Sequence, residues 1–155
     1  MTDSLPIATR PERISVFMQH LMDDAGREEN VRRVAKVAWL FADAGAVALV
    51  ALISPYRASR QRAREEHDSS GLPFVEVHMA APVEVCAKRD PKGLYARASV
   101  GGIASFTGVD DPYEAPEAPE LELRPDVQLD QAVDMVVRSL DERTRGLDRR
   151  RPNSN

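Results

Sequence analysis

An unbroken apolar run at residues 46–53, AVALVALI, constrains the fold of this 155-residue chain more than any other segment. A run without polar alternation is typical of a strand that is buried on both faces, as in parallel sheets. Ser54 and Pro55 follow it directly, and this pair has the form of a helix N-cap with proline at the first helical position. The sequence therefore predicts a buried strand over 46–53 and a helix over 55–66. Ligands bind at this carboxyl end of the strands in open α/β sheets.

Helical and strand-like patterns alternate along the rest of the chain. Apolar residues at helical spacing predict helices over 13–22, 28–44, 83–89, 94–100 and 129–140. Short β-like runs predict strands over 74–79 and 120–124. Gly45 is expected to end the second helix. Residues 90–119, rich in glycine and proline, are expected to form a functional lid or to be disordered. This order predicts a three-layer α/β domain with a parallel sheet.

Length and composition limit the classes of protein to which the chain can belong. We expect one domain at 13–143 between disordered ends at 1–12 and 144–155. A net charge of −4 gives no basic surface for nucleic acid, and Cys86, the single cysteine, cannot form an intramolecular disulfide or a cysteine metal cluster. The chain has no membrane-spanning run and no signal-peptide pattern, so a soluble cytoplasmic protein is predicted. No metal site is predicted, because three histidines lack ligand spacing: His20, His67 and His78.

Four short stretches resemble one enzyme family in order and in spacing. They are REENVRR at 27–33, the segment 41–57 with FADAG and ISPYR, DPKGLY at 90–95, and FTGVDDPYEAPEAPE at 106–120. Together they resemble the adenylyl-sulfate kinases (APS kinases) over roughly residues 22–140. The resemblance implies a P-loop-kinase-like parallel sheet. It also implies transfer of the γ-phosphate of ATP, with Mg²⁺, to the 3′-hydroxyl of adenosine 5′-phosphosulfate in sulfate assimilation.

The same resemblance implies which residues bind the acceptor substrate: Arg27, Asn30, Ile53, Ser54, Lys92, Leu94 and Phe106. Arg27 would contact the anionic part and Asn30 polar groups, while Phe106 would stack on the adenine. Arg27 and Asn30 stand near the start of a predicted helix, where backbone N–H groups favour an anion. The nearby lid residues Arg89 and Arg97 either neutralise transferred charge when the lid closes or belong to a solvated loop.

Ser54 has two interpretations. The family tradition assigns this serine as a phosphoserine intermediate. A serine before proline is also explained as a helix cap, and direct in-line transfer between two bound nucleotides needs no covalent intermediate. We therefore predict that Ser54 is a cap that lines the substrate site. Tyr113 and Glu114, which lie among prolines, are predicted to anchor the return of the lid.

The chain departs from the family pattern at its beginning. No segment matches the Walker A loop G-x-x-x-x-G-K-[ST], since no lysine precedes Lys36 and the only glycine before it is Gly26. The Asp-Gly-Asp motif of the family is missing as well. In the family, the P-loop strand lies between the strands that correspond to 46–53 and 74–79. These two strands are therefore expected to have unpaired inner edges, and direct ligands for ATP and Mg²⁺ are expected to be absent.

The sequence leaves three interpretations open. The chain is part of a kinase whose N-terminal portion lies elsewhere, or it is a regulatory module that binds adenylyl sulfate beside a partner. That partner would be ATP sulfurylase or a second copy of the chain. The third interpretation is a decayed gene product that does not fold alone. In each case we predict that this chain by itself has no kinase activity, because the Walker A loop is missing.

Overall fold

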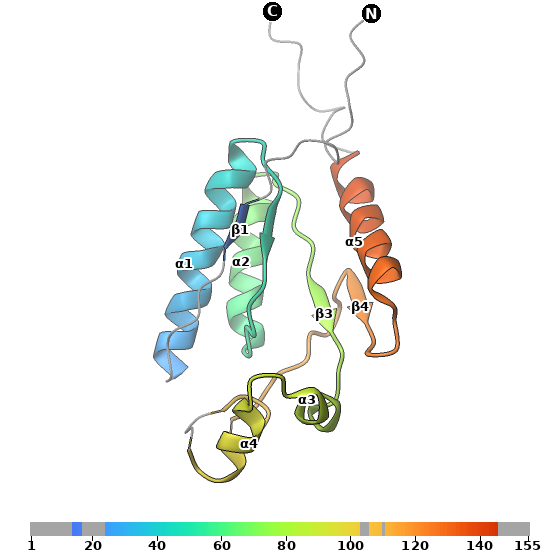
Figure 1. Cartoon of the computed structure of the whole chain (residues 1–155). Helices are drawn as coiled ribbons and strands as arrows, with labels where there is room; N and C mark the ends of the chain where they lie inside the picture. Colours follow the sequence, from blue (N-terminus) through green and yellow to red (C-terminus); the bar gives the residue numbers. More distant parts are fainter. Residues whose placement is uncertain (1–13, 17–23, 103–105, 110, 146–155) are drawn as a thin grey trace, which may run out of the picture.

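The computed structural model describes residues 14–16, 24–102, 106–109 and 111–145, and its strands form two parallel pairs. β1 (Ile14–Val16) pairs with β2 (Ala48–Val50), and β3 (Val77–Met79) pairs with β4 (Leu121–Leu123). All four strands run toward the same end of the molecule, which carries α3 (Val83–Arg89) and α4 (Leu94–Ser99) (Figure 1). The predicted α/β class with parallel strands is confirmed.

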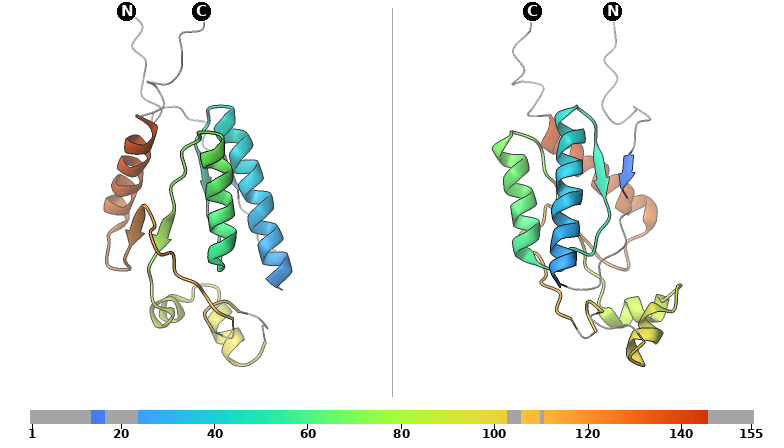
Figure 2. Two further views of the ribbon diagram at one scale, coloured as in Figure 1. Left: turned by 180° about the vertical axis from the view of Figure 1, so that it is seen from behind. Right: turned by 90° about the vertical axis from the view of Figure 1, so that its left-hand side faces the viewer.

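The long helices flank these strand pairs. α1 (Asp24–Asp43) and α2 (Arg57–Ser69) lie side by side, and α1 packs on β2, whereas α5 (Leu129–Thr144) packs on β4 (Figure 2). The core lies along α1, where Val31, Val34 and Ala38 are buried at helical spacing. No described helix is long and apolar enough to cross a membrane.

The end of α1 is predicted correctly by its glycine. Gly45 has a φ of +85°. Its N–H donates to the Ala42 carbonyl at 2.9 Å, and the Ala46 N–H donates to the Phe41 carbonyl at 2.9 Å. These are the two hydrogen bonds of a Schellman motif, in which a left-handed residue ends the helix. The chain therefore reverses here and enters β2.

The predicted helix over 13–22 is wrong for Ile14–Val16, which form strand β1. Residues 13 and 17–22 lie outside the described residues. Ile14 aligns with Ala48 and Val16 with Val50 in a parallel ladder. Tertiary pairing outweighs local periodicity here, because β-branched residues at alternate positions suit a strand edge.

The apolar run at 46–53 is a strand, but a shorter and more exposed one than predicted. Its ladder covers only Ala48–Val50, and Leu49, Val50 and Ile53 are 41%, 42% and 65% exposed. Burial on both faces is therefore wrong for this run. Among the described strands no ladder joins β2 to β3.

The later elements follow their predicted positions closely. α3 has the predicted bounds, and α4 ends one residue earlier than predicted, at Ser99. The strands predicted at 74–79 and 120–124 are shortened to β3 and β4. α5 continues to Thr144, the first residue of the predicted tail.

Candidate functional site

The predicted site elements gather at one end of the molecule. The amino ends of α1 and α2, the carboxyl ends of β2 and β3, and the helices α3 and α4 all lie at the lower end in Figure 1. Helix amino ends expose unpaired N–H groups, and strand carboxyl ends are the ligand edge of a parallel sheet. This end therefore has the geometry of a site for an anionic ligand.

Arg27 lies in the first turn of α1, and its side chain is only 13% exposed. Its Nη2 forms an ion pair with the carboxylate of Asp111 and lies 3.5 Å from the Tyr56 hydroxyl. A cation near a helix amino end opposes the helix dipole, so this guanidinium depends on nearby negative charge. Asn30 is half-buried and lies three residues further along, on the same face of α1.

Phe106 and Asp111 are held in one tight turn. The N–H of Val109 donates to the Phe106 carbonyl at 3.0 Å, and the N–H of Gly108 donates to the Asp111 carbonyl at 2.7 Å. Gly108 permits this turn with a φ of +86°. The Phe106 ring contacts Tyr95 of α4 edge to face, with 4.9 Å between centroids. The turn thus connects an aromatic ring beside α4 to the guanidinium of α1.

The interpretation of Ser54 as a helix cap is wrong. Ser54 has a φ of +44° and precedes the helix by three residues, since α2 begins at Arg57. The N–H of Arg57 instead donates to Oε2 of Glu114 at 2.6 Å. The Glu114 carboxylate belongs to the segment that follows the lid, and its negative charge is favourable at the positive end of the helix dipole. A cap supplied across 57 residues is invisible to local sequence patterns.

The predicted anchoring role of Tyr113 and Glu114 is confirmed. The N–H of Glu114 donates to the Pro55 carbonyl at 2.9 Å, and its carbonyl accepts from Nη2 of Arg60 at 2.6 Å. The Tyr113 ring stacks on His78 at 6.1 Å and lies 5.8 Å from the guanidinium of Arg60. Nη1 of Arg60 also donates to the Ser54 carbonyl at 2.6 Å. The turn at Ser54 and the lid's return are therefore fixed by one arginine.

We expect Glu114→Ala to lower the free energy of unfolding by about 1–2 kcal/mol, the usual cost of a lost helix cap. Ser54→Ala is expected to change it by less than about 0.5 kcal/mol, because the Ser54 side chain makes no cap hydrogen bond to α2. Urea unfolding followed by circular dichroism measures both variants. The opposite order of effects would contradict the assignment of Glu114 as the cap.

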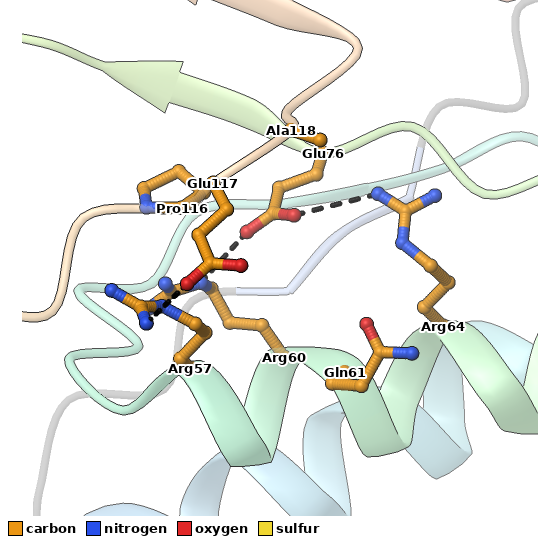
Figure 3. Close-up of a pocket in the computed structure, with 8 residues that line it drawn as sticks. All are labelled: Arg57, Arg60, Gln61, Arg64, Glu76, Pro116, Glu117 and Ala118. Atoms are coloured by element: carbon orange, nitrogen blue, oxygen red, sulfur yellow. Dashed lines mark hydrogen bonds and ion pairs between the residues drawn. The ribbon is translucent and has the colours of Figure 1, made fainter.

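Four charged residues next to this site are joined by ion pairs and are here called the arginine clamp: Arg60, Arg64, Glu76 and Glu120. Nε of Arg60 lies 2.7 Å from one oxygen of Glu76, and Nη2 of Arg64 lies 3.4 Å from the other. Both guanidinium groups are turned toward Glu76 (Figure 3). These three residues line a hollow of about 280 Å³. The donors of Arg64 are taken by carboxylates, and those of Arg60 by Glu76 and by the backbone carbonyls of Ser54 and Glu114. We therefore interpret the clamp as a structural connection between α2 and β3.

Glu120 receives the most hydrogen bonds in the clamp. Its carboxylate accepts two bonds of 2.7 Å from Arg64, one of 2.6 Å from Arg143 and one of 2.8 Å from the Glu76 N–H. Burial opposes its charge, but the hydrogen bonds from Arg64 and from the Glu76 backbone outweigh burial and lower the pKa of Glu120. The side chain is 10% exposed, so its ionised form depends on these partners.

The predicted lid residues divide between two places. Arg89 ends α3 and donates to the Pro125 carbonyl at 2.9 Å, whereas Lys92 and Arg97 are exposed around α4. Leu94 begins α4, and its N–H donates to Oδ1 of Asp90 at 2.7 Å.

Arg89 also lines a largely apolar groove of about 200 Å³ at the carboxyl ends of β3 and β4. Its lining includes Met79, Ala81, Leu123, Val127 and Ala132.

Comparison with known proteins shows the family to which this chain belongs. A family model described as adenylylsulphate kinase matches residues 13–124. The chain belongs to this family. It is 50% identical over 125 residues to the adenylyl-sulfate kinase of Emericella nidulans, a match that covers 76% of this chain and 61% of that protein. The chain thus spans less than two thirds of this relative's length.

The fold agrees with a solved adenylylsulphate kinase structure. The Mycobacterium tuberculosis APS kinase CysC, in complex with AMPPNP and APS, superposes with a TM-score of 0.75 at 44% identity. The match covers 78% of this chain and 70% of that one. A bifunctional enzyme, NodQ of Rhizobium sp. strain BR816, is 54% identical over 101 residues, which are 65% of this chain and 16% of NodQ. The P-loop-kinase-like fold inferred from the sequence is confirmed.

Two side chains that the sequence patterns did not single out lie at the candidate adenylylsulphate kinase site. Tyr56 and Asp111 both contact Arg27. Each stands inside a family-like stretch, ISPYR and FTGVDDPYEAPEAPE, so the sequence indicated the segments without indicating the contacts. The ion pair joins residues 84 positions apart, and no local spacing predicts such a pair.

Proposed function

We propose that this chain carries the acceptor half of an adenylyl-sulfate kinase and binds adenosine 5′-phosphosulfate between Arg27 and Phe106. The supporting observation is the position of Arg27. Its mostly buried guanidinium stands at a helix amino end, and its carboxylate partner comes from the turn that holds Phe106. A guanidinium that binds a carboxylate here is suited to bind a phosphate or sulfate group in the same geometry.

The other candidate residues have complementary properties in this proposal. Phe106 offers a ring for the adenine, and stacking of a base on an aromatic ring contributes about 1–3 kcal/mol. Asn30 supplies an amide to the polar groups of the nucleotide. The exposed cations Lys92 and Arg97 approach the anion from the lid, while Ile53, Ser54 and Leu94 line the pocket. Ile53 lies three residues after β2 and is 65% exposed, so its side chain is accessible to a ligand.

In this proposal the chain carries only part of the binding site for ATP, the phosphate donor. We propose that the groove beside Arg89 receives the adenine of ATP, because a flat base fits an apolar groove with a guanidinium at its rim. No Walker A segment is available for the phosphates. Among the described residues no group of three or more His, Cys, Asp or Glu side chains is arranged to hold a metal ion. The part of the described residues in this proposal is to bind and orient the nucleotides.

We therefore expect the 155-residue chain by itself to show no ATP-dependent 3′-phosphorylation of adenosine 5′-phosphosulfate. Loss of one preorganised contact to a developing charge costs about 3 kcal/mol, and the Walker A loop supplies several such contacts. The check is a product assay by ion-exchange chromatography on purified protein, with a full-length family enzyme as positive control. Turnover that rises in proportion to the concentration of this chain would contradict the expectation.

A second candidate function is a non-catalytic module that binds adenylyl sulfate beside another protein, such as ATP sulfurylase or a second copy of the chain. Two observations favour it: the inner edges of β2 and β3 lack a joining strand among the described strands, and the matched region forms 16% of a bifunctional relative. Sedimentation of the chain alone and mixed with ATP sulfurylase tests this function. A single species at the monomer mass in the first sample, with no complex in the second, would exclude it.

The cytoplasmic location of this protein stays a prediction from its sequence.

A further inference from the structure

The ion pair between Arg27 and Asp111 places a carboxylate where the proposed ligand would place its anion. The two side chains are 13% and 18% exposed, so water screens their attraction only partly. The Tyr56 hydroxyl lies near the same Nη2, at 3.5 Å. A phosphate or sulfate group bound to this Nη2 would therefore lie close to the carboxylate of Asp111.

We propose that Asp111 is a specificity-determining residue that competes with the ligand's anion for Arg27. This inference rests on the proposed function of the acceptor site. A phosphosulfate group must displace the carboxylate or accept its repulsion, because like charges within a few ångströms disfavour one another. A neutral nucleoside leaves the ion pair intact and experiences neither cost. Asp111 thus lowers the affinity of the site for anionic ligands and leaves its affinity for a neutral nucleoside unchanged.

The exchange of partners also reaches Phe106. Asp111 shares its turn with Phe106 through the hydrogen bonds from Gly108, Val109 and its own N–H, which donates to the Phe106 carbonyl at 3.3 Å. While Asp111 is paired with Arg27, this ion pair connects the turn to α1. Release of the carboxylate by an anionic ligand removes this contact between the turn and α1.

Calorimetric titration with a charged and an uncharged ligand tests the competition. We expect Asp111→Asn, which keeps the shape and removes the charge, to tighten binding of adenosine 5′-phosphosulfate about tenfold, the effect of removing one nearby like charge. Binding of adenosine is expected to stay within about twofold. Asp134→Asn on the exposed side of α5 is the matched control and should change neither affinity. Weaker or unchanged binding of the charged ligand by Asp111→Asn would overturn the proposal, as would an equal gain for adenosine.

A measurement without ligand separates this inference from the proposed function. We expect hydrogen–deuterium exchange at the amides of Gly108 and Val109 to become several times faster in Asp111→Asn than in the parent chain, because the turn loses its fastening to α1. Unchanged exchange would overturn the claim that the ion pair holds the turn. If neither the parent nor Asp111→Asn binds adenosine 5′-phosphosulfate, the proposed function and the competition both fail, while exchange still decides the role of the ion pair. Binding by the variant alone would support both.

Discussion

Replacing Glu120 with glutamine is expected to lower the free energy of unfolding by about 3 kcal/mol. Glutamine keeps the shape of the side chain but removes the charge that Arg64 and Arg143 share. The Arg64 side chain is 18% exposed and that of Glu120 is 10% exposed, so the variant leaves a half-satisfied cation away from water. The loss also loosens the start of β4, whose first residue follows Glu120.

Urea unfolding of Glu120→Gln and Glu117→Gln measures this effect against a matched control. Glu117 pairs with Arg57 at 2.7 Å, but it is 74% exposed. Such a surface pair contributes less than about 1 kcal/mol. We expect the Glu117 variant to lie within about 0.5 kcal/mol of the parent chain. Equal losses in the two variants would show that burial of the arginine clamp does not determine its contribution.

The pH dependence of unfolding provides a second measurement of the same ion pairs. The hydrogen bonds that outweigh burial hold the pKa of Glu120 below its ordinary value of 4.5. A carboxylate with a lowered folded-state pKa contributes stability that is fully present above the unfolded-state pKa and is lost as the pH falls through the folded-state pKa. The stability difference between the parent chain and Glu120→Gln should therefore narrow below about pH 4.5. A difference that is constant with pH would contradict the role of the charge.

Replacing Arg27 with glutamine is expected to weaken binding of adenosine 5′-phosphosulfate by roughly 13- to 160-fold. Charge-assisted hydrogen bonds to an anion contribute about 1.5–3 kcal/mol, and glutamine retains neither the charge nor the planar fork of donors. Because the side chain is only 13% exposed, its interaction with a ligand is less screened than that of a surface arginine. Calorimetric titration of the variant gives the ratio of dissociation constants.

The matched control for Arg27 is Arg33→Gln on the same helix. Arg33 is 59% exposed and pairs with Glu29 at 2.7 Å, away from the candidate site. Its substitution should change the affinity by less than about twofold. Equal weakening by the two variants would indicate that the charge of α1 as a whole attracts the ligand, and that Arg27 has no specific contact with it.

The sequence predicts the helices better than the strands, because the signals for a helix lie in neighbouring residues. The inner stripe of α1 and its glycine stop are contained in neighbouring residues, so their pattern determines the helix. The strands depend on pairing with distant segments. Ile14–Val16 become a strand only because β2 offers an edge, and the apolar run at 46–53 is exposed because β2 pairs on a single side in the described strands.

The candidate site shows the same division between local and distant effects. The family stretches identified Arg27, Ser54 and Phe106 and correctly placed Arg27 and Ser54 near a helix start and a strand end. The partners of these residues come from distant parts of the chain. Glu114 caps α2 in place of Ser54, and Asp111 binds Arg27, across separations that no pattern of local spacing encodes. Motifs thus indicate which residues belong to a site, while the contacts between them require the fold.

Direct titration of adenosine 5′-phosphosulfate into the 155-residue chain tests the proposed acceptor half most directly. The sample should first show a cooperative thermal transition and a single species in sedimentation, so that a negative result cannot arise from misfolding. We expect saturable heat with one ligand per chain, which disappears at the same ligand concentrations in Arg27→Gln. No binding heat at any temperature, from a folded and monodisperse sample, would contradict the proposal that this chain holds the acceptor substrate.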